Sequence, residues 1–134
     1  MEWFPWYPLE MSLANILTEI ETLERRQSNP FKKAENRRRH AALRSLRLRA
    51  ARIRGTHTEA EWLRLVEACG NVCVRCGGKT IDGTFTKDHI LPAARGGCDC
   101  IQNIQPMCRN CNSAKWGDDR DYRPRSAVEA VAHV

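Results

Sequence analysis

Two Cys-x-x-Cys pairs limit the possible folds of this 134-residue chain more than any other feature of its sequence. Cys73 and Cys76 form the first pair, and Cys108 and Cys111 form the second. Each pair can present two thiolates to one tetrahedral Zn²⁺ ion at about 2.3 Å. The chain has 7 cysteines, an odd number, and in a reducing compartment two such pairs favour metal binding over a disulfide framework. We therefore expect one closed zinc site with four cysteine ligands.

The segment between the two pairs, residues 77–107, is longer than the ~15–20 residues of a simple zinc ribbon. An Asp-Gly pair at 82–83 is typical of a hairpin turn. The alternating residues 84–91 after it predict a strand, and residues 101–108 predict a second one. A helix is expected from residue 109 onward. The predicted order is strand, loop, strand and helix, held together by one zinc ion.

The other three cysteines are less suited to bind a metal. Cys98 and Cys100 are alternative zinc ligands. A Cys-x-Cys pair, however, spaces its two sulfur atoms differently from a Cys-x-x-Cys pair, and this one lies in a Gly-rich loop, so we expect both to be loop cysteines without a metal. Cys69 falls on the apolar stripe of a helix that Thr58 and Glu61 begin with a capping box, and we expect it in the core.

These residues resemble the HNH endonuclease family. The resemblance covers about residues 58–117 and rests on several motifs in the family's order: Asp88-His89, Pro92, Gly96-Gly97, Asn103 and the sequence CRNCNSAK at 108–115. It implies an α+β fold with a ββα-metal core pinned by the four-cysteine structural zinc, preceded here by N-terminal helices. Small phage-type or mobile-element nucleases of this kind often carry a basic stretch as well.

The resemblance also implies a site. His89 would act as the general base, Asp88 and Asn112 would bind a catalytic divalent metal, and Asn103 would hold the ring of His89 through its side-chain oxygen. Asn112 stands where the family name has a second histidine, and an amide oxygen favours Mg²⁺ or Mn²⁺ over Ni²⁺ or Zn²⁺. The implied reaction is hydrolysis of DNA to 5′-phosphate and 3′-hydroxyl ends.

Other interpretations of the same residues stay open. Neighbouring residues in a strand point to opposite faces, so Asp88 and His89 can share a task only if the strand twists or ends there. They could instead be a structural pair. The chain as a whole could be a non-catalytic zinc module that binds DNA or RNA, or an accessory protein of a phage packaging machine. A binding module would not need the set of Asp88, His89, Asn103 and Asn112.

The net charge of +6 comes from one region. Residues 25–54 hold 12 Lys and Arg and a single acid, Glu35, whereas the rest of the chain has more acids than bases. Such a segment suits a polyanion, because each phosphate that it neutralises releases counterions. We expect a long helix here that binds DNA through Arg37, Arg38, Arg39, Arg44, Arg47, Arg49, Arg52 and Arg54. Lys115 is a weaker candidate, either contacting a phosphate or lying in solvent.

Apolar spacing predicts a short helix after Ser12, and the stripe of Leu43, Leu46, Ala50 and Ile53 predicts the packed face of the basic helix. The aromatic start, with Trp3, Phe4, Trp6 and Tyr7 among prolines, offers a surface for a protein partner or is a loose leader.

The expected organisation is a leader at 1–11, a helical region at 12–55, a nuclease domain at 56–117 and a peripheral tail at 118–134. The sequence contains neither a run of ~18 apolar residues nor a secretory signal. We therefore expect no membrane contact and a cytoplasmic location, in a bacterium or a phage-infected host cell.

Overall fold

The computed structural model describes residues 11–132, which form two compact units that meet in the sequence at Ala50 and Ala51. The aromatic residues Trp3, Phe4, Trp6 and Tyr7 lie outside the described residues. No helix in the described range is long and apolar enough to cross a membrane.

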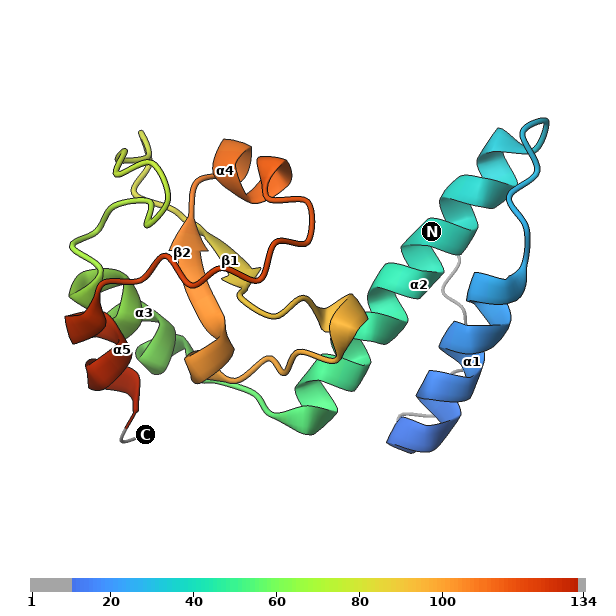
Figure 1. The fold of residues 1–134 in the computed structure, drawn as a ribbon, viewed down its shortest axis with the longest axis horizontal. Coiled ribbons are helices and arrows are strands. Elements are labelled where there is room, and N and C mark those ends of the chain that lie inside the picture. The colour runs from blue at the N-terminus through green and yellow to red at the C-terminus, as the bar shows by residue number, and fades with distance from the viewer. Residues whose placement is uncertain (1–10, 133–134) are drawn as a thin grey trace. The chain divides into compact units, whose positions relative to one another are not determined.

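The first unit is a helical hairpin of α1 (Leu13–Arg25) and most of α2 (Lys33–Arg54), seen in Figure 1. Ser12 begins α1 as predicted, because its hydroxyl accepts a hydrogen bond from the Asn15 N–H at 3.3 Å. Ile16 of α1 packs on Leu46 and Ala50 of α2. The predicted stripe of α2 is therefore its buried face, except that Ile53 is exposed.

The second unit begins with the end of α2 and continues into α3 (Glu59–Ala68). Thr58 and Glu61 form the predicted capping box, with both reciprocal hydrogen bonds present. Trp62, Leu65 and Val66 face inward and form the centre of the core. The helix ends at a left-handed Gly70, whose φ is 78°.

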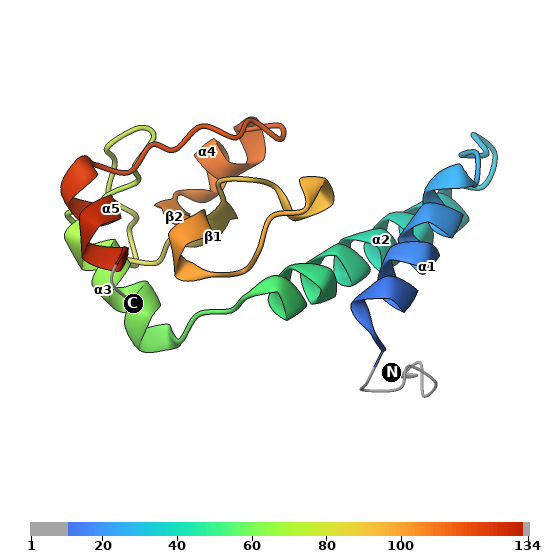
Figure 2. The same cartoon turned by 60° about the horizontal axis from the view of Figure 1, so that its bottom comes forward.

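A two-stranded antiparallel sheet lies against α3, and its strands are β1 (Thr86–His89) and β2 (Ile104–Met107). A one-turn 3-10 helix, η2 (Ile101–Asn103), leads into β2, and α4 (Arg109–Ala114) follows it. The predicted order of strand, loop, strand and helix is confirmed (Figures 1 and 2), and the fold is α+β. Both strands are shorter than predicted. The Asp82 and Asn103 side chains accept from the backbone N–H groups of Thr84 and Leu91 at either side of β1, and the start of the predicted second strand forms η2 instead.

The C-terminal segment is part of the core and not a peripheral tail, which corrects the prediction. It ends in α5 (Arg125–Val131), which packs on α3 (Figure 2). Ala127 and Val131 of α5 are buried in the core. Before it, Arg123 donates a hydrogen bond to the Gln102 carbonyl at 3.0 Å. The short apolar face of α3 needs a second helix to cover it, and α5 supplies that cover.

Candidate active site

The four paired cysteines converge on one point. The Sγ atoms of Cys73, Cys76, Cys108 and Cys111 all lie within 4.8 Å of one another. Tetrahedral coordination at about 2.3 Å requires sulfur atoms about 3.8 Å apart, so the cluster fits a zinc ion. Gly77 adopts a φ of 72° and donates its N–H to the Cys73 carbonyl at 2.7 Å, which closes the first turn. The predicted cysteine site is therefore positioned to bind zinc.

The thiols of this cluster have unequal proton affinities. Burial acts to raise the pKa of Cys73, but hydrogen bonds from the backbone N–H groups of Cys76, Cys108 and Arg75 outweigh it and bring this pKa down to about 6. Burial raises the pKa of Cys111 to about 12, and the neighbouring sulfur atoms add to the rise. A cation held among the four sulfur atoms would favour their thiolate forms.

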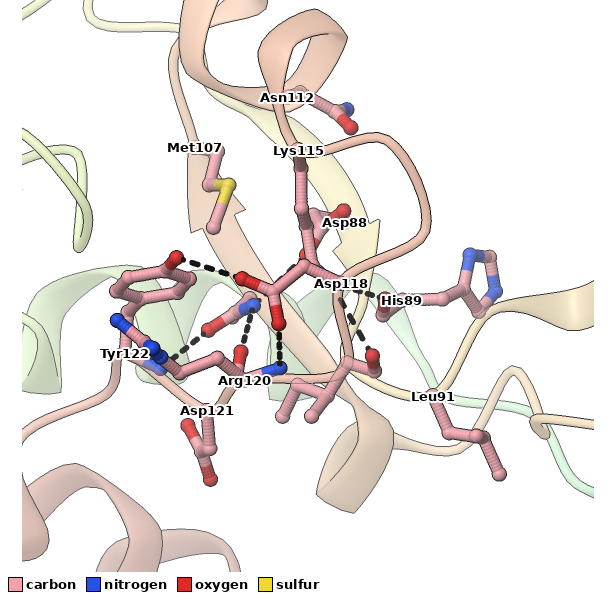
Figure 3. A network of polar contacts seen from close by, with 12 residues as sticks. Asp88, His89, Leu91, Met107, Asn112, Lys115, Asp118, Arg120, Asp121 and Tyr122 are labelled. Carbon is pink, nitrogen blue, oxygen red and sulfur yellow. Dashed lines mark hydrogen bonds and ion pairs between the residues drawn. The ribbon is translucent and has the colours of Figure 1, made fainter. Parts of the chain in front are cut away.

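Asp88 lies on β1, and its buried side chain pairs with Lys115 at the end of α4. The Lys115 Nζ, labelled with Asp88 in Figure 3, donates to Asp88 Oδ2 at 2.7 Å. The Gln105 Nε2 donates to the same oxygen at 2.8 Å. In the described part of the chain, no hydrogen bond reaches the other oxygen, Oδ1. Asp88 is thus held firmly by one oxygen and keeps the second for a further ligand.

Lys115 is a buried residue, which corrects the prediction that it contacts phosphate or lies in solvent. Its Nζ donates to Asp88 and also to the backbone carbonyls of His89 at 2.7 Å and Ile90 at 3.2 Å. These three bonds use every N–H of the ammonium group. A buried ammonium is stable only beside compensating oxygen atoms, and the end of β1 provides them.

His89 ends β1, and its ring points away from the Asp88–Lys115 pair (Figure 3). Side chains alternate along a strand, which sends these two neighbours to opposite faces. β1 nevertheless ends at His89, which is the condition under which Asp88 and His89 can share a task. The ring Nε2 lies 3.0 Å from the Oδ1 of Asp99, a residue of the loop between the strands. The His89 side chain is 15% exposed, so it is sheltered and still reachable from solvent.

Asn103 contacts the loop backbone, whereas the prediction placed its oxygen against the His89 ring. Its Oδ1 accepts from the Leu91 N–H at 2.8 Å, and its Nδ2 donates to the carbonyls of Leu91 at 3.0 Å and Cys98 at 2.8 Å. These bonds close the loop between the strands. The His89 ring is held by Asp99 instead, because the loop that Asn103 closes brings that carboxylate under it.

Asn112 lies on α4, on the Asp88 side of β1. Its Nδ2 donates to Thr86 Oγ1 at 2.9 Å, and Thr86 and Asp88 share one face of the strand because they are two residues apart. The amide N–H thus points at Thr86, and the amide oxygen remains for another partner. A carboxylate oxygen and an amide oxygen are the donor types that Mg²⁺ and Mn²⁺ prefer.

Residues 73–123 match the family model described as HNH endonuclease. We call this part of the chain, which is similar to that family, the HNH segment. No curated protein and no solved structure matches the chain. The HNH segment contains the four zinc-site cysteines together with Asp88, His89, Asn103 and Asn112.

The basic helix α2 lies outside the HNH segment, and its arginines differ in exposure. Arg37, Arg38, Arg44, Arg52 and Arg54 are exposed, whereas Arg39, Arg47 and Arg49 are half-buried. Arg47 pairs with Glu24 of α1 at 2.7 Å, and Arg39 donates to the Arg26 carbonyl. Some of the predicted DNA-binding arginines therefore also hold the helical hairpin together.

The remaining cysteines are away from the zinc site. Cys98 and Cys100 form a disulfide within the loop of the HNH segment, so they are loop cysteines as predicted. Cys69 lies in the core beside Trp62 and Leu65, and burial raises the pKa of its thiol to about 11. The prediction that Cys69 is a core residue is confirmed.

Two residues beside the site were missed in the sequence. Asp99 is an acid in a Gly-rich loop, and Gln105 is a fully buried amide in β2 that links Asp88 to the Arg120 carbonyl and the Tyr122 N–H. A polar residue among apolar strand positions was the available signal for Gln105. No local pattern marks Asp99, whose partner is 10 residues away.

Proposed function

We propose that this chain is a metal-dependent endonuclease that hydrolyses DNA phosphodiester bonds with His89 as the general base. The observation that carries the proposal is that His89 is the only histidine of the HNH segment and is not a zinc ligand. The four cysteines satisfy a structural zinc ion. The ring of His89 is therefore left for proton transfer, at the end of a strand and close to solvent.

In the proposed reaction, His89 takes a proton from a water molecule as the water oxygen bonds to phosphorus. The bond from phosphorus to the 3′ oxygen breaks, and that oxygen takes a proton from solvent. The products carry a 5′-phosphate and a 3′-hydroxyl. An imidazole suits this role because its ordinary pKa range lies near neutrality.

Asp88 and Asn112 would hold the divalent metal, Mg²⁺ or Mn²⁺, through the Asp88 Oδ1 and the amide oxygen of Asn112. When bound, the metal would neutralise charge on the scissile phosphate. Lys115 would position Asp88, because its ammonium holds Oδ2 while Oδ1 faces another ligand. The exposed arginines of α2 would supply phosphate contacts for DNA, independently of its sequence.

The test is cleavage of supercoiled plasmid DNA by the zinc-loaded protein with Mg²⁺, with Mn²⁺ and with neither. His89→Ala should abolish nicking and keep its zinc, measured by elemental analysis. His40→Ala, at an exposed position of α2, is the matched control and should cut normally. If the wild-type protein binds a fluorescent duplex and never cuts it, the chain is a binding module and the proposal fails.

A further inference from the structure

Asp99 occupies an unusual position for a loop acid. Its side chain is 17% exposed, and its Oδ1 lies 3.0 Å from the Nε2 of His89. The second carboxylate oxygen, Oδ2, faces the Arg52 Nε at 3.8 Å and the His57 Nδ1 at 4.0 Å. The carboxylate thus bridges the His89 ring on one side and two basic side chains on the other.

The backbone of Asp99 is held as closely as its carboxylate. Its N–H donates to the carbonyls of Ala51 and Gly55, both at 3.1 Å. Its own carbonyl lies 2.6 Å from the Nδ1 of His57, whose side chain is only 5% exposed. These three hydrogen bonds fix the backbone of Asp99 beside residues 51–57, and from that position its carboxylate reaches His89.

This arrangement decides which nitrogen of His89 carries the proton. An ionised carboxylate only accepts hydrogen bonds, so the Nε2 of the neutral His89 ring must be the protonated nitrogen. The other nitrogen, Nδ1, then has the free lone pair. The reverse holds at His57, where a carbonyl oxygen faces Nδ1 and makes it the protonated nitrogen.

We infer that Asp99 is the positioning residue of His89: it holds the ring in the tautomer in which Nδ1 accepts the proton from water. The role of this tautomer in catalysis rests on the proposed function. The tautomer itself follows from the contact with Asp99 and does not depend on that function. Residues 51–57 support Asp99 from outside the HNH segment. Gly55 belongs to this support, because a Cβ there would lie 3.1 Å from the Cβ of Cys100.

The decisive variant is Asp99→Asn. The carboxamide of Asn has nearly the same shape as the carboxylate of Asp. Its oxygen should take the place of Oδ2, because Arg52 and His57 face that position with N–H donors. The NH₂ group then faces His89 Nε2 as a donor. The neutral ring can accept that bond only if its proton moves to Nδ1, which removes the lone pair from the nitrogen that should take the water proton.

The first measurement is the tautomer of each histidine in the full-length, zinc-loaded protein, by long-range proton–nitrogen NMR of ¹⁵N-histidine. The expected result is a proton on Nε2 of His89 and on Nδ1 of His57 in the same spectrum. Single His→Gln variants assign the signals. In Asp99→Asn the His89 proton should move to Nδ1. A wild-type His89 with its proton on Nδ1 would overturn the inference, whether or not the chain is a nuclease.

The second measurement is cleavage. Asp99→Asn should lower kcat by about 10–100-fold, the range typical of a lost orienting partner, with no change in the affinity for a duplex. Asp119→Asn, which removes an exposed carboxylate paired with Arg95, is the matched control and should leave kcat unchanged. An Asp99→Asn protein that cuts at the wild-type rate would overturn the inference. A tautomer that shifts as expected in a protein that never cuts would support the positioning and reject the nuclease.

Discussion

Lys115 Nζ lies 2.7 Å from Asp88 Oδ2 in an ion pair whose two side chains are only 3% and 8% exposed. The pair joins the end of α4 to the middle of β1. Removing both charges from water is costly, and the Gln105 amide and the two backbone carbonyls around the pair offset that cost. The strand that ends in His89 is therefore tied by a buried charge pair to α4, the helix that carries Cys111 of the candidate zinc site.

Lys115→Met should lower the free energy of unfolding by about 3–5 kcal/mol, because it leaves the Asp88 carboxylate buried without its cation. Urea denaturation of the zinc-loaded protein measures the change. Adding Asp88→Asn to Lys115→Met removes the uncompensated charge and should restore part of the lost stability. If Lys115→Met costs less than about 1 kcal/mol, which is typical of an exposed pair, the buried pair is not formed in solution.

Gly97→Ala should disrupt the loop that carries Asp99. A Cβ at residue 97 would lie 1.9 Å from the Leu91 carbonyl oxygen and 2.9 Å from Asn103 Nδ2, so the backbone must move. We expect a loss of about 1–3 kcal/mol in stability and a larger loss of cleavage. Gly96→Asn is the control, since the neighbouring glycine has φ of 92° but open space around its Cβ, and Asn tolerates that conformation. Equal effects of the two substitutions would contradict the steric argument.

Cys73→Ser or Cys108→Ser should unfold the second unit, because zinc binding contributes to its folding free energy. Circular dichroism of each variant, and of the wild-type protein with a strong chelator, measures the loss of structure. Zinc affinity should fall as the pH falls. The cause is that Cys111, with a pKa raised to about 12, keeps its proton in the metal-free cluster and must release it to bind zinc. A unit that stays folded without metal would refute a structural zinc.

Replacing Arg37, Arg38, Arg44 and Arg54 with Gln should weaken DNA binding equally for all sequences. These side chains are exposed on α2, and the slope of log K against log salt should flatten by about 0.9 for each lost phosphate contact. Titration of a fluorescent duplex at several salt concentrations gives the slope. The control is the double variant Arg64→Gln/Arg125→Gln, which removes exposed charges from α3 and α5. It should leave the slope of log K against log salt nearly unchanged. Identical slopes for the two variants would show that α2 does not contact DNA.

Local signals in the sequence determined much of this protein. The capping box of Thr58 and Glu61 predicted the start of α3, the stripe of Leu43, Leu46 and Ala50 predicted the packed face of α2, and the two Cys-x-x-Cys pairs predicted one zinc site. Each signal is a spacing of a few residues whose geometry follows from one helix turn or one tight loop. Such spacings keep their meaning in most folds, which is why they could be interpreted without the structure.

The partners of the polar residues were decided only by the tertiary structure. Lys115 was expected in solvent or on phosphate and is buried against Asp88, and Asn103 was expected on His89 and holds the loop backbone. Asp99 reaches His89 because three hydrogen bonds between its backbone and residues 51–57 place its loop under the ring. A buried charged side chain is stable only beside a partner that compensates its charge. Which side chains are buried depends on how distant segments pack, and no short spacing in the sequence predicts that packing.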